Sequence, residues 1–212
     1  MLSTNHLIEG IPPFIGKFSS LQVLFAFENV LGGHIPDASG QLGSINKLNL
    51  AISKLSGSIL LSLYNLSSMT TFSLFENEFS GSLPTNLFLT LPHLQLFLIN
   101  ENQFTGSLPV SLSNASELQY FQVTKNNFTR NISINFGGLH RFKVFLAGRN
   151  NLGSGDNDEM NLLQSLVNCS SLQEISLQDN QFKGTLPNVP VIFQPNLPIL
   201  QLAKILFLER SL

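Results

Sequence analysis

One nine-residue phrase recurs three times in this chain and limits what it can fold into more than any other feature. The copies read ENEFSGSLP at 76–84, ENQFTGSLP at 101–109 and DNQFKGTLP at 179–187. Asn, Phe, Gly, Leu and Pro keep their places while the polar residues between them vary. Because packing fixes apolar positions and leaves exposed positions free to drift, the phrase indicates one structural unit used repeatedly.

The phrase is part of a longer frame, L-x-x-L-x-L-x-x-N-x-L-x-G-x-L/I-P, in which Phe, Ile or Met replaces some Leu residues. Seven frames start at Leu21, Ile45, Met69, Leu94, Leu118, Phe142 and Leu172, at separations of 24, 24, 25, 24, 24 and 30 residues. A half-unit, NHLIEGIPPFIG, precedes the first frame. A period of about 20–29 residues is typical of leucine-rich repeats, in which each unit buries its apolar face against the next.

The frame predicts one short strand for each unit. In the unit that starts at Leu94, alternation along the strand turns Phe97 and Ile99 toward the core. We therefore expect an α/β repeat solenoid: a leucine-rich-repeat horseshoe segment with a parallel concave sheet of about seven strands and a convex side of short 3-10 or helical turns. Residues 1–188 form about seven units plus the half-unit, and residues 189–212 form a divergent C-terminal tail. Because neither end has a polar capping unit, we expect a segment of a longer protein that associates in solution.

A column of asparagines follows the strands. We expect each amide to bond backbone groups of its own coil and of the neighbouring coil, because a buried turn needs both donors and acceptors. The column, which begins with Asn5 in the half-unit, continues through Asn29, Asn77, Asn102, Asn126, Asn150 and Asn180. Asn102 and Asn126 are expected to be buried.

Some units depart from the frame. Ser53 replaces the Asn of the second unit, and Arg130 replaces the Gly of the fifth. The sixth unit carries an insertion in which Asp158 is expected to cap a short helix that turns Met160, Leu163 and Leu166 inward. Cys169 falls in an apolar column three residues before a frame start, so we interpret it as core filler rather than a reactive thiol.

Composition argues against several functions. The 212 residues carry 11 Lys and Arg against 13 Asp and Glu, and the pI is near 6.0, so the chain lacks the basic surface of a nucleic-acid-binding protein. We find no signal peptide and no apolar run of the roughly 18 residues that would span a membrane. The single Cys excludes an intramolecular disulfide.

Catalytic and metal-binding patterns are also missing from the sequence. His6, His34, His93 and His140 fall in separate units at different phases, which disfavours a metal or triad site. The acidic run at 156–159 matches a calcium loop only loosely, because the EF-hand spacing and its Gly are missing. We therefore predict a non-enzymatic protein with no cofactor and no metal.

The variant L-x-G-x-I/L-P, as in LSSMTTFSLFENEFSGSLP at 66–84, resembles the plant-specific class of leucine-rich repeats. The stretches LFLTLPHLQLF and NNLGSGDNDEMNLLQSLVNCSSLQEISLQDNQFKGTLP resemble ectodomains of plant leucine-rich-repeat receptor-like serine/threonine kinases, in the subgroup that contains immune receptors for bacterial peptides. The resemblance covers about residues 2–188. It implies plasma-membrane or extracellular location, a role in signalling or defence, an extracellular peptide or protein ligand, and a co-receptor repeat protein as a further partner. No kinase motif is present in this chain.

Five N-x-S/T sequons are consistent with this extracellular interpretation. The candidate glycosylation sites are Asn65, Asn114, Asn127, Asn131 and Asn168.

The predicted ligand-binding surface is the concave face, formed by the variable strand positions. We expect Phe25, Phe27, Phe75 and Tyr120 to be substantially exposed there as candidate anchors. The side chains expected to be buried are Phe72, Phe79, Phe97, Phe104, Phe121 and Phe182. One row changes sign along the axis, from Glu28, Glu76 and Glu101 to Lys125 and Arg149, so an extended peptide would place a basic group at one end and an acidic group at the other.

In that hypothesis Lys125 and Arg149 bind a carboxylate of the ligand, and Tyr120 is the neighbouring apolar contact. Two alternatives stay open: a secreted repeat protein similar to polygalacturonase inhibitors, and a truncated product without function.

Overall fold

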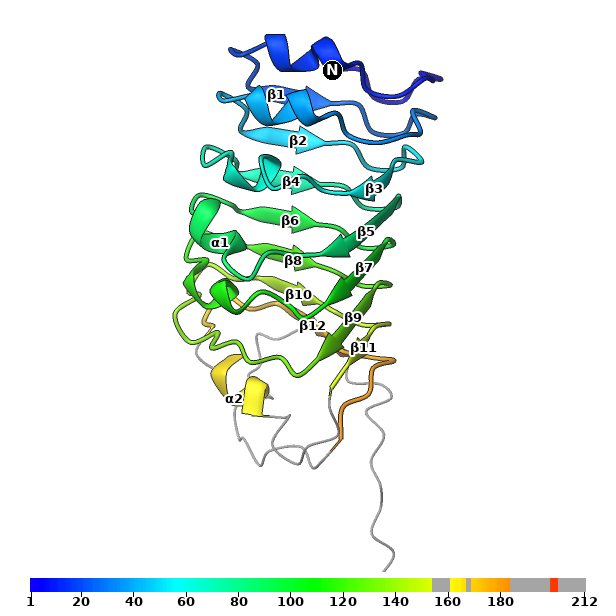
Figure 1. Cartoon of the computed structure of the whole chain (residues 1–212). Coiled ribbons are helices and arrows are strands. Elements are labelled where there is room, and N and C mark those ends of the chain that lie inside the picture. The colour runs from blue at the N-terminus through cyan, green and yellow to red at the C-terminus, as the bar shows by residue number, and fades with distance from the viewer. Residues whose placement is uncertain (154–160, 167–168, 184–198, 202–212) are drawn as a thin grey trace, which may run out of the picture.

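The computed structural model describes residues 1–153, 161–166 and 169–183, together with the backbone of 199–201. Successive coils stack one above another from the N-terminus, and each coil adds one strand to the same wall (Figure 1). Within the described residues this main sheet has eight strands, and every neighbouring pair is parallel. The strands are β1 (Val23–Phe25), β2 (Lys47–Asn49), β4 (Thr71–Ser73), β6 (Leu96–Leu98), β8 (Tyr120–Gln122), β10 (Val144–Leu146), β12 (Glu174–Ser176) and β13 (Ile199–Gln201). A parallel repeat solenoid is confirmed.

A second parallel sheet forms the wall next to the main sheet, and the sequence interpretation missed it (Figure 1). It is built from the second half of the repeated phrase, where the frame predicted no strand. Within the described residues it has five strands: β3 (Ser56–Ser58), β5 (Glu78–Ser82), β7 (Gln103–Gly106), β9 (Asn127–Arg130) and β11 (Asn151–Leu152).

Short helical turns close the coils on the remaining side. They are the 3-10 turns η1 (Pro13–Lys17), η2 (Asp37–Gln41), η3 (Leu63–Asn65) and η4 (Val110–Asn114), and the helices α1 (Leu87–Thr90) and α2 (Asn161–Leu166). Pro12, Pro36 and Pro109 stand directly before η1, η2 and η4 with φ between −71° and −63°. Because proline fixes φ near this value and has no N–H to leave unpaired, it starts such turns.

The core, built largely of Leu side chains, contains a stack of aromatic rings contributed by the central residues of β4, β6 and β8. Phe72, Phe97 and Phe121 are fully buried, and their ring centroids follow one another at 5.5 and 5.6 Å with interplanar angles of 15° and 11°. A second stack joins Phe104 to Phe128 at 6.3 Å beneath the second sheet. All six phenylalanines predicted to be buried are 2% exposed or less, so the strand register is confirmed.

Three features of the ends bear on the sequence predictions. In α2, Leu163 and Leu166 are buried as expected, whereas Asp158 and Met160 lie outside the described residues. The tail expected at 189–212 contributes β13, and the spacing L-x-x-L-x-L at 197–202 is the signal that could have found it. Phe18 falls in an apolar column but is 50% exposed, because it lies on the first coil of the stack.

Candidate functional site

The concave face is the surface of the main sheet opposite the core, and its side chains stand in rows across the coils. The first row contains Val23, Lys47, Thr71, Leu96, Tyr120, Val144 and Glu174, which are consecutive partners in the strand register. The second contains Phe25, Asn49, Ser73, Leu98, Gln122, Leu146 and Ser176. The third lies just beyond the strands and contains Phe27, Ala51, Phe75, Asn100, Thr124, Gly148 and Gln178.

The four predicted anchors are on this face but less exposed than expected. Phe25, Phe27, Phe75 and Tyr120 are all half-buried. The prediction of substantial exposure is wrong in degree, because strands about 4.8 Å apart let flanking side chains cover part of each ring. The rings of Phe25 and Phe27 lie 6.5 Å apart.

The anchors do not form one cluster. Phe75 lies two coils from Phe27, which is about 10 Å at the usual strand spacing. Tyr120 starts β8 and Lys125 comes five residues later, so roughly 15 Å of extended chain separates them. The hypothesis that Lys125 and Arg149 bind a ligand carboxylate, with Tyr120 as the neighbouring apolar contact, stays a prediction.

A fourth row, next to the third, has a backbone conformation that the sequence did not reveal. Its residues are left-handed, with φ between +52° and +57°: Glu28, Ile52, Glu76, Glu101, Lys125, Arg149 and Asp179. Positive φ values usually favour Gly or Asn, so the residue types in this row did not predict the left-handed conformation. Only their position, directly before the asparagine column, could have suggested it. The left-handed turn moves these side chains off the strand and onto the rim of the concave face.

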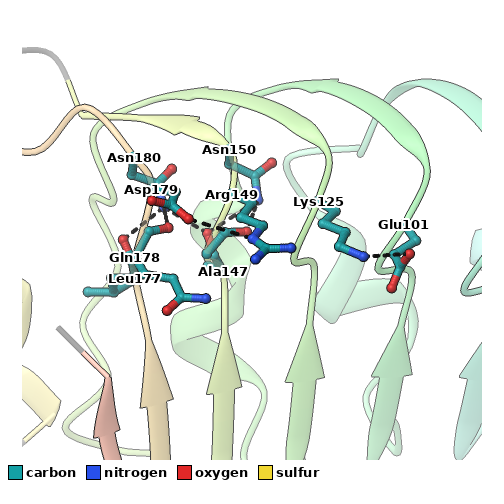
Figure 2. A network of polar contacts seen from close by, with 10 residues as sticks. Glu101, Lys125, Ala147, Arg149, Asn150, Leu177, Gln178, Asp179 and Asn180 are labelled. Carbon is teal, nitrogen blue, oxygen red and sulfur yellow. Dashed lines mark hydrogen bonds and ion pairs between the residues drawn. The ribbon is translucent and has the colours of Figure 1, made fainter. Parts of the chain in front are cut away.

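Two ion pairs join neighbours within this left-handed row, as Figure 2 shows. Lys125 Nζ lies 2.8 Å from Glu101 Oε2, and Arg149 Nε lies 3.6 Å from Asp179 Oδ2. The side chains are roughly half exposed, so each pair contributes little to stability, about 1 kcal/mol or less. Any ligand carboxylate at Lys125 or Arg149 must compete with these partners.

The asparagine column holds the turns together. The side chain of Asn150 donates to the carbonyls of Ala147 and Gly148 in its own coil and of Val123 in the preceding coil, at 3.0–3.2 Å. Its Oδ1 accepts the backbone N–H of Phe128 at 3.0 Å. The same pattern recurs at Asn29, Asn77, Asn102, Asn126 and Asn180.

Burial differs along the column. Asn29, Asn126 and Asn150 are buried, whereas Asn77, Asn102 and Asn180 are half-buried. The expectation that Asn126 is buried is confirmed, but for Asn102 it is wrong, although its hydrogen bonds are complete. Ser53 is fully buried and keeps part of the pattern, because its hydroxyl donates to the carbonyls of Ala51 and Ala26 at 3.0 and 3.3 Å.

The sequon asparagines that the structure describes lie outside the strands of the main sheet. Asn65 and Asn114 end the turns η3 and η4 and are exposed, and Asn127 is exposed at the start of β9. Asn131 is half-buried, and Asn168 lies outside the described residues.

The single thiol is part of the core. Cys169 is 4% exposed, and its Sγ lies 3.1 Å from the carbonyl oxygen of Phe136. Burial raises the pKa of the Cys169 thiol to about 11, because the thiolate loses its hydration. The interpretation as core filler is confirmed.

Two hollows mark the N-terminal coils. A shallow polar one of about 870 Å³ runs along the start of the strands, lined by Gln22, Asn46, Lys47, Thr70 and His93 among others. An apolar one of about 350 Å³ lies against the first coil, between Leu2, Ile8 and Leu24. In the part of the chain that the structure describes, no group of three His, Cys, Asp or Glu could hold a metal ion, and no helix could cross a membrane.

Comparison with known proteins rests on solved structures. No protein-family model matches the chain, and no curated protein does. The leucine-rich-repeat ectodomain of the plant membrane receptor kinase GASSHO1/SCHENGEN3 from Arabidopsis thaliana, in complex with CASPARIAN STRIP INTEGRITY FACTOR 2, is 30% identical with a TM-score of 0.80, over 88% of this chain and 22% of that chain. The Arabidopsis receptor kinase HAESA, in complex with the peptide hormone IDA and the co-receptor SERK1, is 26% identical with a TM-score of 0.82, over 96% of this chain and 33% of that one.

The fold is not confined to plants. The Leptospira interrogans leucine-rich-repeat protein LIC12759 is 20% identical with a TM-score of 0.63, a likeness that concerns the fold alone. The chain spans a third or less of the length of the two plant receptors. Repeat register, parallel sheets and structural neighbours together show that this chain folds as a leucine-rich-repeat solenoid similar to plant receptor-kinase ectodomains.

Proposed function

We propose that this chain is a non-catalytic recognition module that binds an extended peptide or protein along its concave face. The observation that carries the proposal is the difference between the inward-facing and the outward-facing residues of each coil. The Leu, Phe and Asn side chains that point inward stabilise the fold. The rows that face outward instead combine half-exposed aromatic, amide and charged side chains that are aligned across neighbouring coils. Such mixed surfaces suit recognition of a second chain. The peptide-bound states of the GASSHO1/SCHENGEN3 and HAESA ectodomains support it.

The parent protein in this proposal is a plant receptor-like serine/threonine kinase of the plasma membrane, involved in signalling or defence, with a co-receptor repeat protein as second partner. The identities of 30% and 26% with the GASSHO1/SCHENGEN3 and HAESA structures support the kinase parent and the co-receptor. The coding sequence that follows Leu212 tests it. A membrane span and a kinase in frame are expected, and a cysteine cap followed by a stop would favour a secreted inhibitor instead.

An extracellular module would carry N-linked glycans. Exposed Asn65, Asn114 and Asn127 are the best placed acceptors, and Asn131 and Asn168 complete the set. Secretion from plant cells followed by peptide N-glycosidase treatment should lower the mass and convert occupied Asn residues to Asp. An unchanged mass would contradict glycosylation.

Binding is tested by selecting peptides from a random displayed library on the purified chain. Gln122 faces the concave surface from β8, and Gln103 is exposed on β7 of the second sheet. Gln122→Arg should abolish binding of the selected peptides, whereas Gln103→Arg, the same change on the other sheet, should leave it intact. Equal responses to both variants would overturn the assignment of the concave face.

A further inference from the structure

Only some of the carboxylates in the left-handed row are paired with a cation. Glu101 is neutralised by Lys125, and Asp179 lies beside Arg149. Glu28 and Glu76, by contrast, have no cation within 4.0 Å among the described residues, and Glu28 only accepts the hydroxyl of Thr4 at 3.0 Å. Both are exposed. The acidic part of the rim that is open to a ligand therefore lies over the first coils.

Each of these carboxylates follows a half-exposed aromatic ring of the third row. The pairs are Phe27 with Glu28 and Phe75 with Glu76, and Ala51 lies between the two rings on the intervening coil. Backbone bonds fix this alignment, because Glu28 N–H donates to the carbonyl of Ala51 at 3.0 Å and Ile52 N–H to that of Phe75 at 3.0 Å. Ala51 is fully buried and Ile52 is half-buried, so the surface between the two pairs carries no charge of its own.

The spacing of the two pairs suits one cation. Two coils span about 10 Å. A group centred over Ile52, on the intervening coil, therefore lies about 5 Å along the solenoid axis from the coil of Glu28 and from the coil of Glu76. The negative faces of aromatic rings and the carboxylates both attract a cation, and the planar guanidinium can serve several acceptors at once. An anion placed there would meet two unneutralised carboxylates.

A second observation on the same face points to an occupant. Ser73 lies two residues before Phe75, is 1% exposed, and its hydroxyl has no hydrogen-bond partner among the described residues. A ligand N–H donor that reached this oxygen would supply the partner that the hydroxyl lacks in the fold.

We propose that Phe27, Glu28, Phe75 and Glu76, around the half-buried Ile52, form a subsite for a basic side chain, arginine in preference to lysine, of the extended peptide. This inference rests on the proposed function, because it assigns one contact of the ligand that binds the concave face. Lys125 and Arg149 further along the rim are paired with Glu101 and Asp179, so the two unpaired carboxylates over the first coils set the end at which the basic side chain lies, and with it the direction of the peptide.

The test replaces each arginine of the selected peptides with citrulline, which keeps the shape and removes the charge. At one position the dissociation constant should rise about tenfold, from a cation–π contact and two partly exposed carboxylates. The double variant Glu28→Gln with Glu76→Gln should lose the distinction between arginine and citrulline. Glu78→Gln, an equal change on β5 of the second sheet, should retain it.

A charge-reversal variant distinguishes loss of the subsite from loss of the fold. The double variant Glu28→Lys with Glu76→Lys should select peptides with Asp or Glu where the original chain selects Arg. Peptides that depend on Gln122 but tolerate citrulline everywhere would overturn the subsite and leave the proposed function standing. Peptides that ignore Gln122→Arg would overturn the proposed function and the subsite with it.

Discussion

The Oδ1 of Asn126 accepts a hydrogen bond at 2.9 Å from the backbone N–H of Phe104, which lies 22 residues earlier in the chain. This bond ties one coil to the previous one at a buried turn where water cannot substitute. The same side chain donates to the carbonyls of Val123 and Ile99 at 3.1 and 3.0 Å. One side chain thus satisfies donors and acceptors that the turn leaves unpaired.

Replacing Asn126 with Leu should lower the free energy of unfolding by about 1–3 kcal/mol, because the N–H of Phe104 is left buried without an acceptor. Urea denaturation measures the change. The adjacent Asn127 is exposed and supplies the control, since Asn127→Leu should change stability by less than about 0.5 kcal/mol. Equal effects at both positions would contradict the role of the column.

Arg130 occupies a left-handed position, φ +70°, where neighbouring coils have Gly81 at φ +92° and Gly106 at φ +80°. Arg130→Gly should stabilise the fold by about 0.5–1 kcal/mol, because relief of the Cβ clash exceeds the extra chain entropy of glycine. Thermal unfolding provides the comparison. Thr129→Gly, one residue earlier in β9 and without positive φ, should destabilise instead, and a loss of stability in both variants would refute the strain at Arg130.

The Lys125–Glu101 pair should be weak and sensitive to salt. Lys125→Gln is expected to cost less than about 1 kcal/mol at low ionic strength and almost nothing at about 1 M salt, because both side chains face solvent. Denaturation at the two salt concentrations measures this. A cost that persists at high salt would mean that Lys125 acts through packing.

Cys169 should react slowly with iodoacetamide at about pH 8 in the folded chain and rapidly in urea, because burial raises the pKa of its thiol to about 11. The raised pKa also has a consequence for stability. The contribution of the neutral thiol is present below about pH 9 and falls as the pH rises toward 11, since the unfolded state ionises first. Fast alkylation of the folded chain would show that the coil around Cys169 opens.

The first coil should drive self-association. Ile8, Phe14 and Phe18 are 63%, 56% and 50% exposed, and the two rings touch edge-on at 6.2 Å. The double variant Ile8→Lys with Phe14→Lys should shift the chain toward monomer in light scattering coupled to size exclusion. Leu89→Lys, in α1 at 60% exposure, is the matched control and should not. A wild-type chain that stays monomeric at high concentration would exclude this association.

The sequence by itself determined the period, the strand register and the core. Residues such as Phe72, Phe97 and Phe121 repeat at a spacing that only stacked coils can bury, so their inward direction followed from alternation along each strand. The asparagine column could be predicted equally well, because an amide that recurs after nearly every strand has few roles other than closing a buried turn. These features depend on local pattern repeated many times.

Tertiary structure alone decided the second sheet, the left-handed row and the pairing of charges. The second sheet forms because stacking brings segments such as β5 and β7 into register, and neither segment has a strand pattern of its own. The left-handed turn at Glu76 or Lys125 recurs at the same place in every unit, including Ile52 where Ser53 replaces the asparagine, so the stacking of the coils and not the residue type imposes it. Whether a charge on the rim is paired depends on the residue about 24 positions away that the fold places beside it. Only the folded chain therefore shows that Glu101 has a cation partner whereas Glu28 and Glu76 do not.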